Sequence, residues 1–195
     1  MPNLYIISGA NGSGKTTTAM ILLPQFLNLG EFVNADEIAR GISPFNPESV
    51  AIQAGKIMLQ RLDFLASNQK DFALETTLSS RHYVRFIRKC RDQGYTINLL
   101  YFWLKSPELA IDRVQRRVES GGHNIPIDVI IRRYQRGLKN LFNLYLPLCD
   151  DWLIFDNSDL SAILVARYNH EQGLIINDSL LWNQINNYRK NNNGS

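Results

Sequence analysis

The chain has 195 residues, of which 45% are hydrophobic and 20% charged, and its formal net charge is +3. This composition predicts one globular domain, and no apolar run approaches the roughly 18 residues of a membrane span. Met1-Pro2-Asn3 lacks the basic segment of a signal peptide. Cys90 and Cys149 are too few and too far apart in sequence for a disulfide framework or a zinc site, so we expect half-buried, reduced thiols and a cytoplasmic protein.

The first predicted element is an apolar strand that leads into a complete G-x-x-x-x-G-K-T motif, followed by a helix-compatible run. That strand–loop–helix setting is the one that a phosphate-binding loop requires. Backbone N–H groups and the helix N-terminus of such a loop bind anionic oxygens. Lys15 is expected to reach the β- and γ-phosphates and Thr16 to ligate Mg²⁺, so the sequence predicts binding of a nucleoside triphosphate. The predicted nucleotide contacts are Gly9, Ala10, Asn11, Gly12, Ser13, Gly14, Lys15, Thr16 and Thr17.

The remaining chain alternates apolar strands with helices. Further strands are predicted at residues 32–35, 72–74, 97–104 and 152–155, and helices at 15–29, 48–69, from Ser79 or Ser80 to Gly94, 107–118 and 127–145. A hairpin (162–168 and 174–176), a terminal helix (179–188) and a disordered tail (191–195) complete the chain. This order predicts one α/β domain over residues 1–195, a three-layer P-loop NTPase sandwich with a mainly parallel five-stranded sheet and the hairpin at its edge.

Three acidic residues follow predicted strands, where ligands collect in parallel sheets. Asp36 lies 21 residues beyond Lys15 and is predicted to be the base that phosphoryl transfer needs; it could also cap a short helix over 37–40. Glu75 is expected either to hold Mg²⁺ through water or to bind a substrate hydroxyl, with Thr76 and Thr77 extending the polar rim. Asp156-Asn157-Ser158 is interpreted as a turn, with Asn157 and Ser158 near the adenine.

The helix after Pro107 carries Arg113, Arg116 and Arg117 on one face, at i, i+3 and i+4. A Gly121-Gly122 break and Arg132-Arg133 come next, a pattern that indicates a hinged lid over residues 113–136. Arginines that close over phosphates stabilise transition-state charge. A solvated basic face is the alternative, and His123 is expected to be structural rather than catalytic.

The positive charge is concentrated in residues 81–136, which hold 12 basic and 5 acidic residues, a net charge of +7, against −4 for the remainder. A nucleic-acid surface or a site for a triphosphate and an anionic substrate would each explain this excess. Tyr83 and Phe86 are not arranged as a base-stacking platform, so nucleic acid is the less favoured partner. A polynucleotide kinase and a nucleotide-dependent binding module remain the alternatives to a small-molecule kinase.

The phosphate-binding loop, Asn34-Ala35-Asp36-Glu37, Glu75-Thr76-Thr77, Arg113–Val118, and Ser120–Pro126 with the following Arg132-Arg133-Tyr134 resemble the zeta-toxin family from Leu4 to about Ser158. This resemblance implies a kinase that uses ATP and Mg²⁺ to phosphorylate a hydroxyl of a small molecule, a UDP-amino sugar in the founding toxins or a similar metabolite. It also implies an antitoxin protein as a partner. The roles implied are Asp36 as base, Glu75 as substrate contact, and Arg113, Arg117 and Arg133 as lid arginines.

Overall fold

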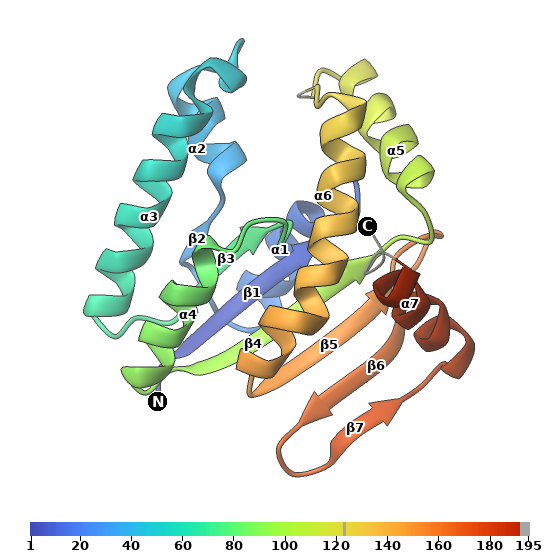
Figure 1. Cartoon of the computed structure of the whole chain (residues 1–195). Coiled ribbons are helices and arrows are strands. Elements are labelled where there is room, and N and C mark those ends of the chain that lie inside the picture. Colours follow the sequence, from blue (N-terminus) through green and yellow to red (C-terminus); the bar gives the residue numbers. More distant parts are fainter. Residues whose placement is uncertain (123, 192–195) are drawn as a thin grey trace.

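The computed structural model describes residues 1–122 and 124–191, the last four of them by their backbone only. One seven-stranded sheet has the order β2-β3-β1-β4-β5-β6-β7 (Figure 1). The first five strands in this order are parallel to one another. Strand β6 pairs antiparallel with β5, and β7 pairs antiparallel with β6. The strands are β1 (Asn3–Gly9), β2 (Phe32–Val33), β3 (Phe72–Thr76), β4 (Thr96–Trp103), β5 (Asp151–Asp156), β6 (Ile163–Asn169) and β7 (Gly173–Ile176).

The predicted five-stranded sheet was therefore too small. The two strands of the edge hairpin belong to the sheet, because β6 pairs along β5, with Ile154 opposite Ala166. The mainly parallel α/β architecture and the hairpin at the edge are confirmed.

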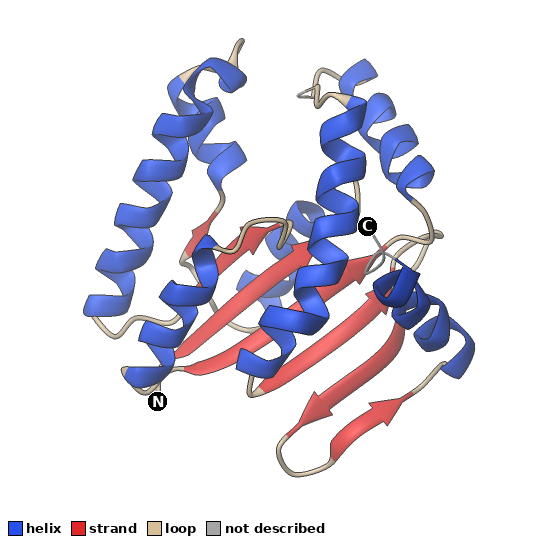
Figure 2. Cartoon of the chain, viewed as in Figure 1, coloured by secondary structure: helices blue, strands red, loops and turns tan. Residues whose placement is uncertain are grey.

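Helices cover both faces of the sheet, unequally (Figure 1, Figure 2). The main apolar cluster packs α3, α4, α6 and α7 on one face, while the second cluster packs α1 on the other through Ala19 and Leu23. A third, smaller cluster joins α5 and α6 to the end of β1. The helices are α1 (Lys15–Phe26), α2 (Ala35–Ile42), α3 (Ala51–Ser67), α4 (His82–Asp92), α5 (Pro107–Glu119), α6 (Ile127–Asn140) and α7 (Ser179–Asn191). Every helix of the described residues is too short or too polar to cross a bilayer.

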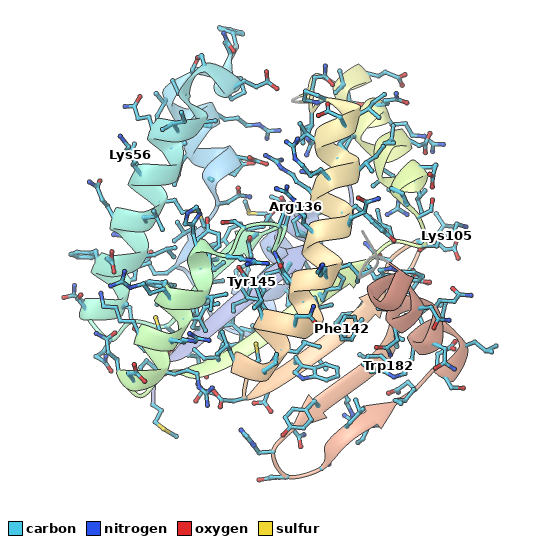
Figure 3. The ribbon with its side chains drawn as sticks, in the orientation of Figure 1. Lys56, Lys105, Arg136, Phe142, Tyr145 and Trp182 are labelled. Atoms are coloured by element: carbon cyan, nitrogen blue, oxygen red, sulfur yellow. The ribbon has the colours of Figure 1, made fainter. Side chains whose placement is uncertain are left out.

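Aromatic packing attaches the C-terminal elements to the sheet. Trp152 stacks on Tyr168 at 5.9 Å and on Trp182 at 6.1 Å between ring centroids, and Phe142 meets Trp182 edge-on (Figure 3). These contacts hold α7 and β6 against β5, and β6 adds Val165 and Ala166 to the buried core.

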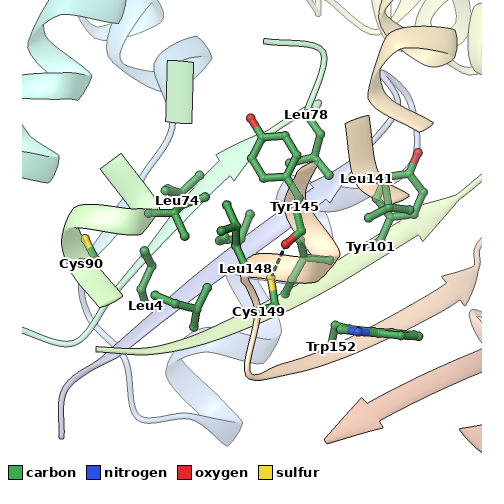
Figure 4. Close-up of a cluster of buried hydrophobic side chains, with 14 of the residues drawn as sticks. Leu4, Leu74, Leu78, Cys90, Tyr101, Leu141, Tyr145, Leu148, Cys149 and Trp152 are labelled. Atoms are coloured by element: carbon green, nitrogen blue, oxygen red, sulfur yellow. Dashed lines mark hydrogen bonds between the residues drawn. The ribbon is translucent and has the colours of Figure 1, made fainter. Parts of the chain in front are cut away.

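Both cysteines are free and lie inside the main cluster, which corrects the prediction of half-buried thiols (Figure 4). Cys90 is fully buried and Cys149 is 7% exposed. The Cys149 thiol donates a hydrogen bond to the Tyr145 carbonyl at 3.2 Å. Burial raises the pKa of the Cys90 thiol to about 12, so it stays protonated at neutral pH.

Several helix ends differ from the prediction for local reasons. The first helix ends at Phe26, before the predicted Leu29, because Asn28 adopts a left-handed conformation (φ 48°) and the Leu29 amide bonds back to the Leu23 carbonyl at 2.9 Å. The predicted helix over 48–69 divides into a 3₁₀ turn (Pro47–Val50) and α3, and the one over 127–145 divides into α6 and a π-helical turn (Leu141–Tyr145). His123 and residues 192–195 of the predicted tail lie outside the described residues.

Candidate active site

The phosphate-binding loop joins β1 to α1 and is braced by two neighbouring segments. Gly12 and Gly14 have positive φ values of 75° and 83°. A Cβ at Gly12 would lie 3.0 Å from the Ala110 carbonyl of α5, and one at Gly14 would lie 2.7 Å from the Asn157 side-chain nitrogen. That same nitrogen donates to the Ser13 carbonyl at 2.8 Å. Glycine is therefore required here both for backbone conformation and for close packing.

Lys15 lies in the mouth of this loop with its ammonium group almost out of solvent. Its Nζ donates to the Ala10 carbonyl at 2.8 Å and lies 3.8 Å from Glu75 Oε1. Burial lowers the pKa of Lys15; the negative charges of Glu75 and Asp36 partly oppose this, and the positive charges of Arg117 and Arg133 lower the pKa further. An anion bound in the loop would therefore stabilise the charged form of this buried lysine.

Glu75 lies at the end of β3 and faces the phosphate-binding loop. Its Oε2 accepts hydrogen bonds from the Thr16 hydroxyl and from the Asn34 side chain, both at 2.8 Å. Burial raises the pKa of Glu75, while Lys15 and the Thr16 hydrogen bond oppose the shift. Of the two roles considered for Glu75, this position favours the one beside the predicted metal ligand, Thr16. Of the described residues, no three His, Cys, Asp or Glu side chains converge as a metal cluster.

Asp36 lies in the first turn of α2 and is not its cap. The Asn34 side chain caps the helix by accepting the Asp36 amide hydrogen at 2.8 Å, so the predicted strand stops at Val33 and the helix begins at Ala35. Among the residues that the structure describes, no hydrogen bond or ion pair engages the Asp36 carboxylate. Unlike Glu75, this carboxylate gives up no hydrogen bond to another described residue when it meets a ligand.

A cleft of about 430 Å³ and a pocket of about 200 Å³ meet at these carboxylates. The cleft is lined by the phosphate-binding loop and the start of α1, by α2 and by α5. The α2/α3 pair and the α5/α6 pair rise on opposite sides above the end of β1 (Figure 1). Thr76 and Thr77 line the smaller pocket, and each hydroxyl also has a local partner, the Leu78 amide and the Ser79 hydroxyl. The cleft and the smaller pocket share four lining residues: Asn11, Lys15, Asp36 and Glu75.

The sequence profile of the zeta toxin family matches residues 1–166. The chain belongs to this family. An uncharacterized protein of Haemophilus influenzae is 30% identical over 126 residues, 65% of this chain and 88% of that protein.

Two similar solved structures confirm the fold. A chain of the AvrRxo1-ORF1:AvrRxo1-ORF2 structure with sulphate ions superposes with a TM-score of 0.77, at 17% identity, over 95% of this chain and 63% of its own length. A chain of the PezAT chromosomal toxin-antitoxin system of Streptococcus pneumoniae superposes with a TM-score of 0.63, at 17% identity, over 99% of this chain and 86% of its own length. The chain described here therefore spans less than two thirds of the length of the AvrRxo1 chain.

The predicted lid arginines of this zeta toxin family chain occupy different positions. Arg117 lines the cleft and Arg133 lines the smaller pocket. The Arg113 guanidinium also reaches the cleft, but it donates to the Asn157 and Ser158 carbonyls, both at 2.7 Å. Arg116 is largely exposed and pairs with Asp112 at 3.1 Å.

The sequence analysis assigned no site role to two residues that contribute to the candidate active site, Asn34 and Tyr83. Asn34 orients Glu75 and caps α2; its signal is an Asn directly before an acidic helix start. Tyr83 lines the smaller pocket, a position that only the folded β3–α4 connection reveals. Asn157, expected near the adenine, donates from its side chain to the Ser13 carbonyl. The predicted turn is present, with the Ser158 amide bonded to the Asp156 side chain at 2.9 Å.

Proposed function

We propose that this protein is an ATP-dependent kinase that transfers the γ-phosphoryl group to a hydroxyl of a small-molecule acceptor. The observation that carries the proposal is that Lys15, Asp36 and Glu75 line both hollows at once. The cleft over the phosphate-binding loop would take the donor and the adjoining pocket the acceptor hydroxyl. Membership of the zeta toxin family supports this reading, as does the related AvrRxo1-ORF1:-ORF2 structure with ATP, whose TM-score is 0.75.

Lys15 would hold the β- and γ-phosphates by exchanging partners. Its present partners are a neutral carbonyl and a carboxylate at 3.8 Å. Phosphate oxygens offer a buried ammonium group more negative charge than these do. Binding of the nucleotide is therefore expected to restore the pKa of Lys15 that burial lowers.

The residues that would hold Mg²⁺ are Thr16 and Glu75. A hydroxyl and a carboxylate that lie 2.8 Å apart are hard oxygen donors, and Mg²⁺ typically combines one or two such groups with substrate phosphates and water. The ion, when bound, neutralises charge that develops on the β- and γ-oxygens. Asn34 would keep the Glu75 carboxylate turned toward that position.

Asp36 would accept the proton of the acceptor hydroxyl. Its carboxylate lies where the two hollows meet, which is where the acceptor oxygen must approach the γ-phosphate. Thr76, Thr77 and Arg133 of the smaller pocket supply polar and positive groups for an acceptor rich in hydroxyls or phosphates. A UDP-amino sugar or a similar metabolite has that chemistry.

The charge distribution favours such a metabolite over a polynucleotide. Of the 12 basic residues between 81 and 136, at least five bind acidic side chains or carbonyl groups within the part of the chain that the structure describes. The carboxylate partners of four of them reduce the surface charge that a phosphodiester backbone would need, while Arg113 bonds to neutral carbonyls. The five are Lys89, Arg91, Arg113, Arg116 and Arg132.

An antitoxin partner and a cytoplasmic location complete the proposal. The PezAT structure comes from a toxin-antitoxin system, and this chain shares its fold. The cytoplasm supplies ATP and keeps thiols such as Cys90 reduced.

The test is ATP consumption with a panel of hydroxyl-bearing metabolites, including UDP-N-acetylglucosamine, with product masses recorded. Lys15→Ala should abolish phosphoryl transfer, because no other side chain can replace the ammonium group inside the loop. Lys56→Ala, an exposed lysine on α3, is the matched control and should keep full turnover (Figure 3). Equal turnover by folded Lys15→Ala and Lys56→Ala proteins would refute the kinase proposal.

A further inference from the structure

The connection between β3 and α4 has an unusual conformation beside the acceptor pocket. Leu78 is fully buried yet adopts a left-handed backbone (φ 56°), a region that branched or bulky residues rarely occupy. The Thr76 hydroxyl accepts the Leu78 amide hydrogen at 3.1 Å, and the Thr77 and Ser79 hydroxyls lie 2.8 Å apart. We call residues 76–80 the acceptor loop, because Thr76, Thr77, Ser79 and Ser80 line the smaller pocket.

The acceptor loop is held in this conformation by α6 and the turn that follows it. Asn140 donates from its buried side chain to the Leu78 carbonyl at 2.8 Å, and the Tyr145 hydroxyl donates to the Ser80 carbonyl. Leu78 lies beside Tyr145 in the buried cluster (Figure 4). Two residues of the loop, Leu78 and Ser80, therefore depend on one helical segment.

A further contact between α6 and the acceptor loop needs a glycine. A Cβ built on Gly137 would lie 2.3 Å from the Thr77 carbonyl oxygen, whereas real Cβ atoms essentially never come within 3.0 Å of such an atom. Glycine inside a helix is otherwise unfavourable. Gly137 allows the backbone of α6 to lie directly on the Thr77 carbonyl.

Arg133 lies one helical turn before Gly137, on the same side of α6, and lines the pocket that the acceptor loop also lines. The Tyr134 hydroxyl donates to the Leu104 carbonyl at 2.6 Å and secures that turn of the helix to the end of β4. The distance between the Arg133 guanidinium and the Thr77 hydroxyl is thus set by how closely α6 approaches the loop.

We propose that Gly137 is a positioning residue that joins α6 and the acceptor loop into one preformed half of the acceptor site. Residues 133–140 then keep their place relative to Thr77, and any closing motion of the predicted lid is confined to α5 and the beginning of α6. The kinetic consequence rests on the proposed kinase function, whereas the structural consequence does not.

The test compares Gly137→Ala with Gly55→Ala. Gly55 lies inside α3, and its added Cβ would have nothing within 4 Å. In Gly137→Ala the Thr77 carbonyl must retreat by about 1 Å, and a displacement of that size in a positioned group can lower a rate about 100-fold. With UDP-N-acetylglucosamine as the acceptor probe, we expect kcat/KM for the acceptor to fall about 10- to 100-fold while the KM for ATP changes less than about twofold. Amide exchange of residues 76–80, measured without ligands, should accelerate.

Gly55→Ala should change neither measurement. Identical exchange of residues 76–80 and identical acceptor kinetics in the two variants would overturn the proposal. If the wild-type protein does not phosphorylate the probe, the acceptor is wrong, and the exchange comparison alone decides on Gly137. If Gly137→Ala fails to fold, Asn140→Ala takes its place, because it removes the donor to the Leu78 carbonyl and should loosen the same amides.

Discussion

Exchange of Asp36 for asparagine is the sharpest test of how the two carboxylates divide the chemistry. The Asp36 side chain has no hydrogen bond or ion pair within the described residues, and its helix cap comes from Asn34. Asp36→Asn should therefore change the free energy of unfolding by less than about 0.5 kcal/mol. A lost general base lowers kcat by about 10²–10⁴-fold, which corresponds to roughly 3–5 kcal/mol at 1.36 kcal/mol per tenfold.

Glu75→Gln should give a different result because Glu75 is already engaged. Its Oε2 accepts from Thr16 and Asn34, and its Oε1 faces Lys15. A hydrogen bond to a charged group contributes about 1.5–3 kcal/mol, so neutralising Glu75 should raise the half-saturating Mg²⁺ concentration about 10- to 100-fold. The kcat at saturating Mg²⁺ should change less than that of Asp36→Asn.

The assay is steady-state turnover at several fixed Mg²⁺ concentrations, with ATP binding measured separately. Both variants should still bind ATP, since neither removes a phosphate-loop residue. A near-normal kcat for Asp36→Asn, together with a Mg²⁺-independent loss of kcat for Glu75→Gln, would reverse the two roles.

Two further predictions concern the support of the site. Asn157→Ala removes the donor to the Ser13 carbonyl. It should lower the free energy of unfolding by about 1 kcal/mol and weaken ATP binding several-fold. Unchanged nucleotide affinity would show that the phosphate-binding loop does not depend on this hydrogen bond. Cys90 and Cys149 should react with a thiol reagent at pH 8 only after unfolding, because burial raises the pKa of both thiols and excludes the reagent; rapid reaction of the native protein would contradict their burial.

The local pattern of the sequence predicted most of the fold because each signal was carried by neighbouring residues. The phosphate-binding motif, the apolar strands and the Ser106 cap before Pro107 each depend on fewer than about ten consecutive positions. The start of α2 shows where such local signals are no longer sufficient. Asn34 is a weak cap signal by itself, and its second bond, to Glu75 41 residues away, is invisible until β2 and β3 pair.

The sequence predicted which residues belong to the candidate site, but not which residues contact one another within it. Nothing near residue 137 in the sequence indicates that a carbonyl of the β3–α4 connection will lie against it, so Gly137 looks like an ordinary weak point in a helix. Likewise the spacing of Arg113 and Arg117 predicts one basic face. It cannot predict that the Arg113 guanidinium bonds to the loop after β5.

That difference bears on the prediction that Arg113 acts on the phosphates. Its guanidinium donates to two carbonyls at 2.7 Å, and a charged hydrogen bond contributes about 1.5–3 kcal/mol. Contact with a phosphate would have to replace both bonds, which a bidentate arginine–phosphate pair can do. The exchange would release Asn157, whose side chain holds the Ser13 carbonyl. A phosphate-binding role for Arg113 thus requires its two bonds to the segment after β5, which also carries the brace of the phosphate-binding loop, to be exchanged when the nucleotide binds.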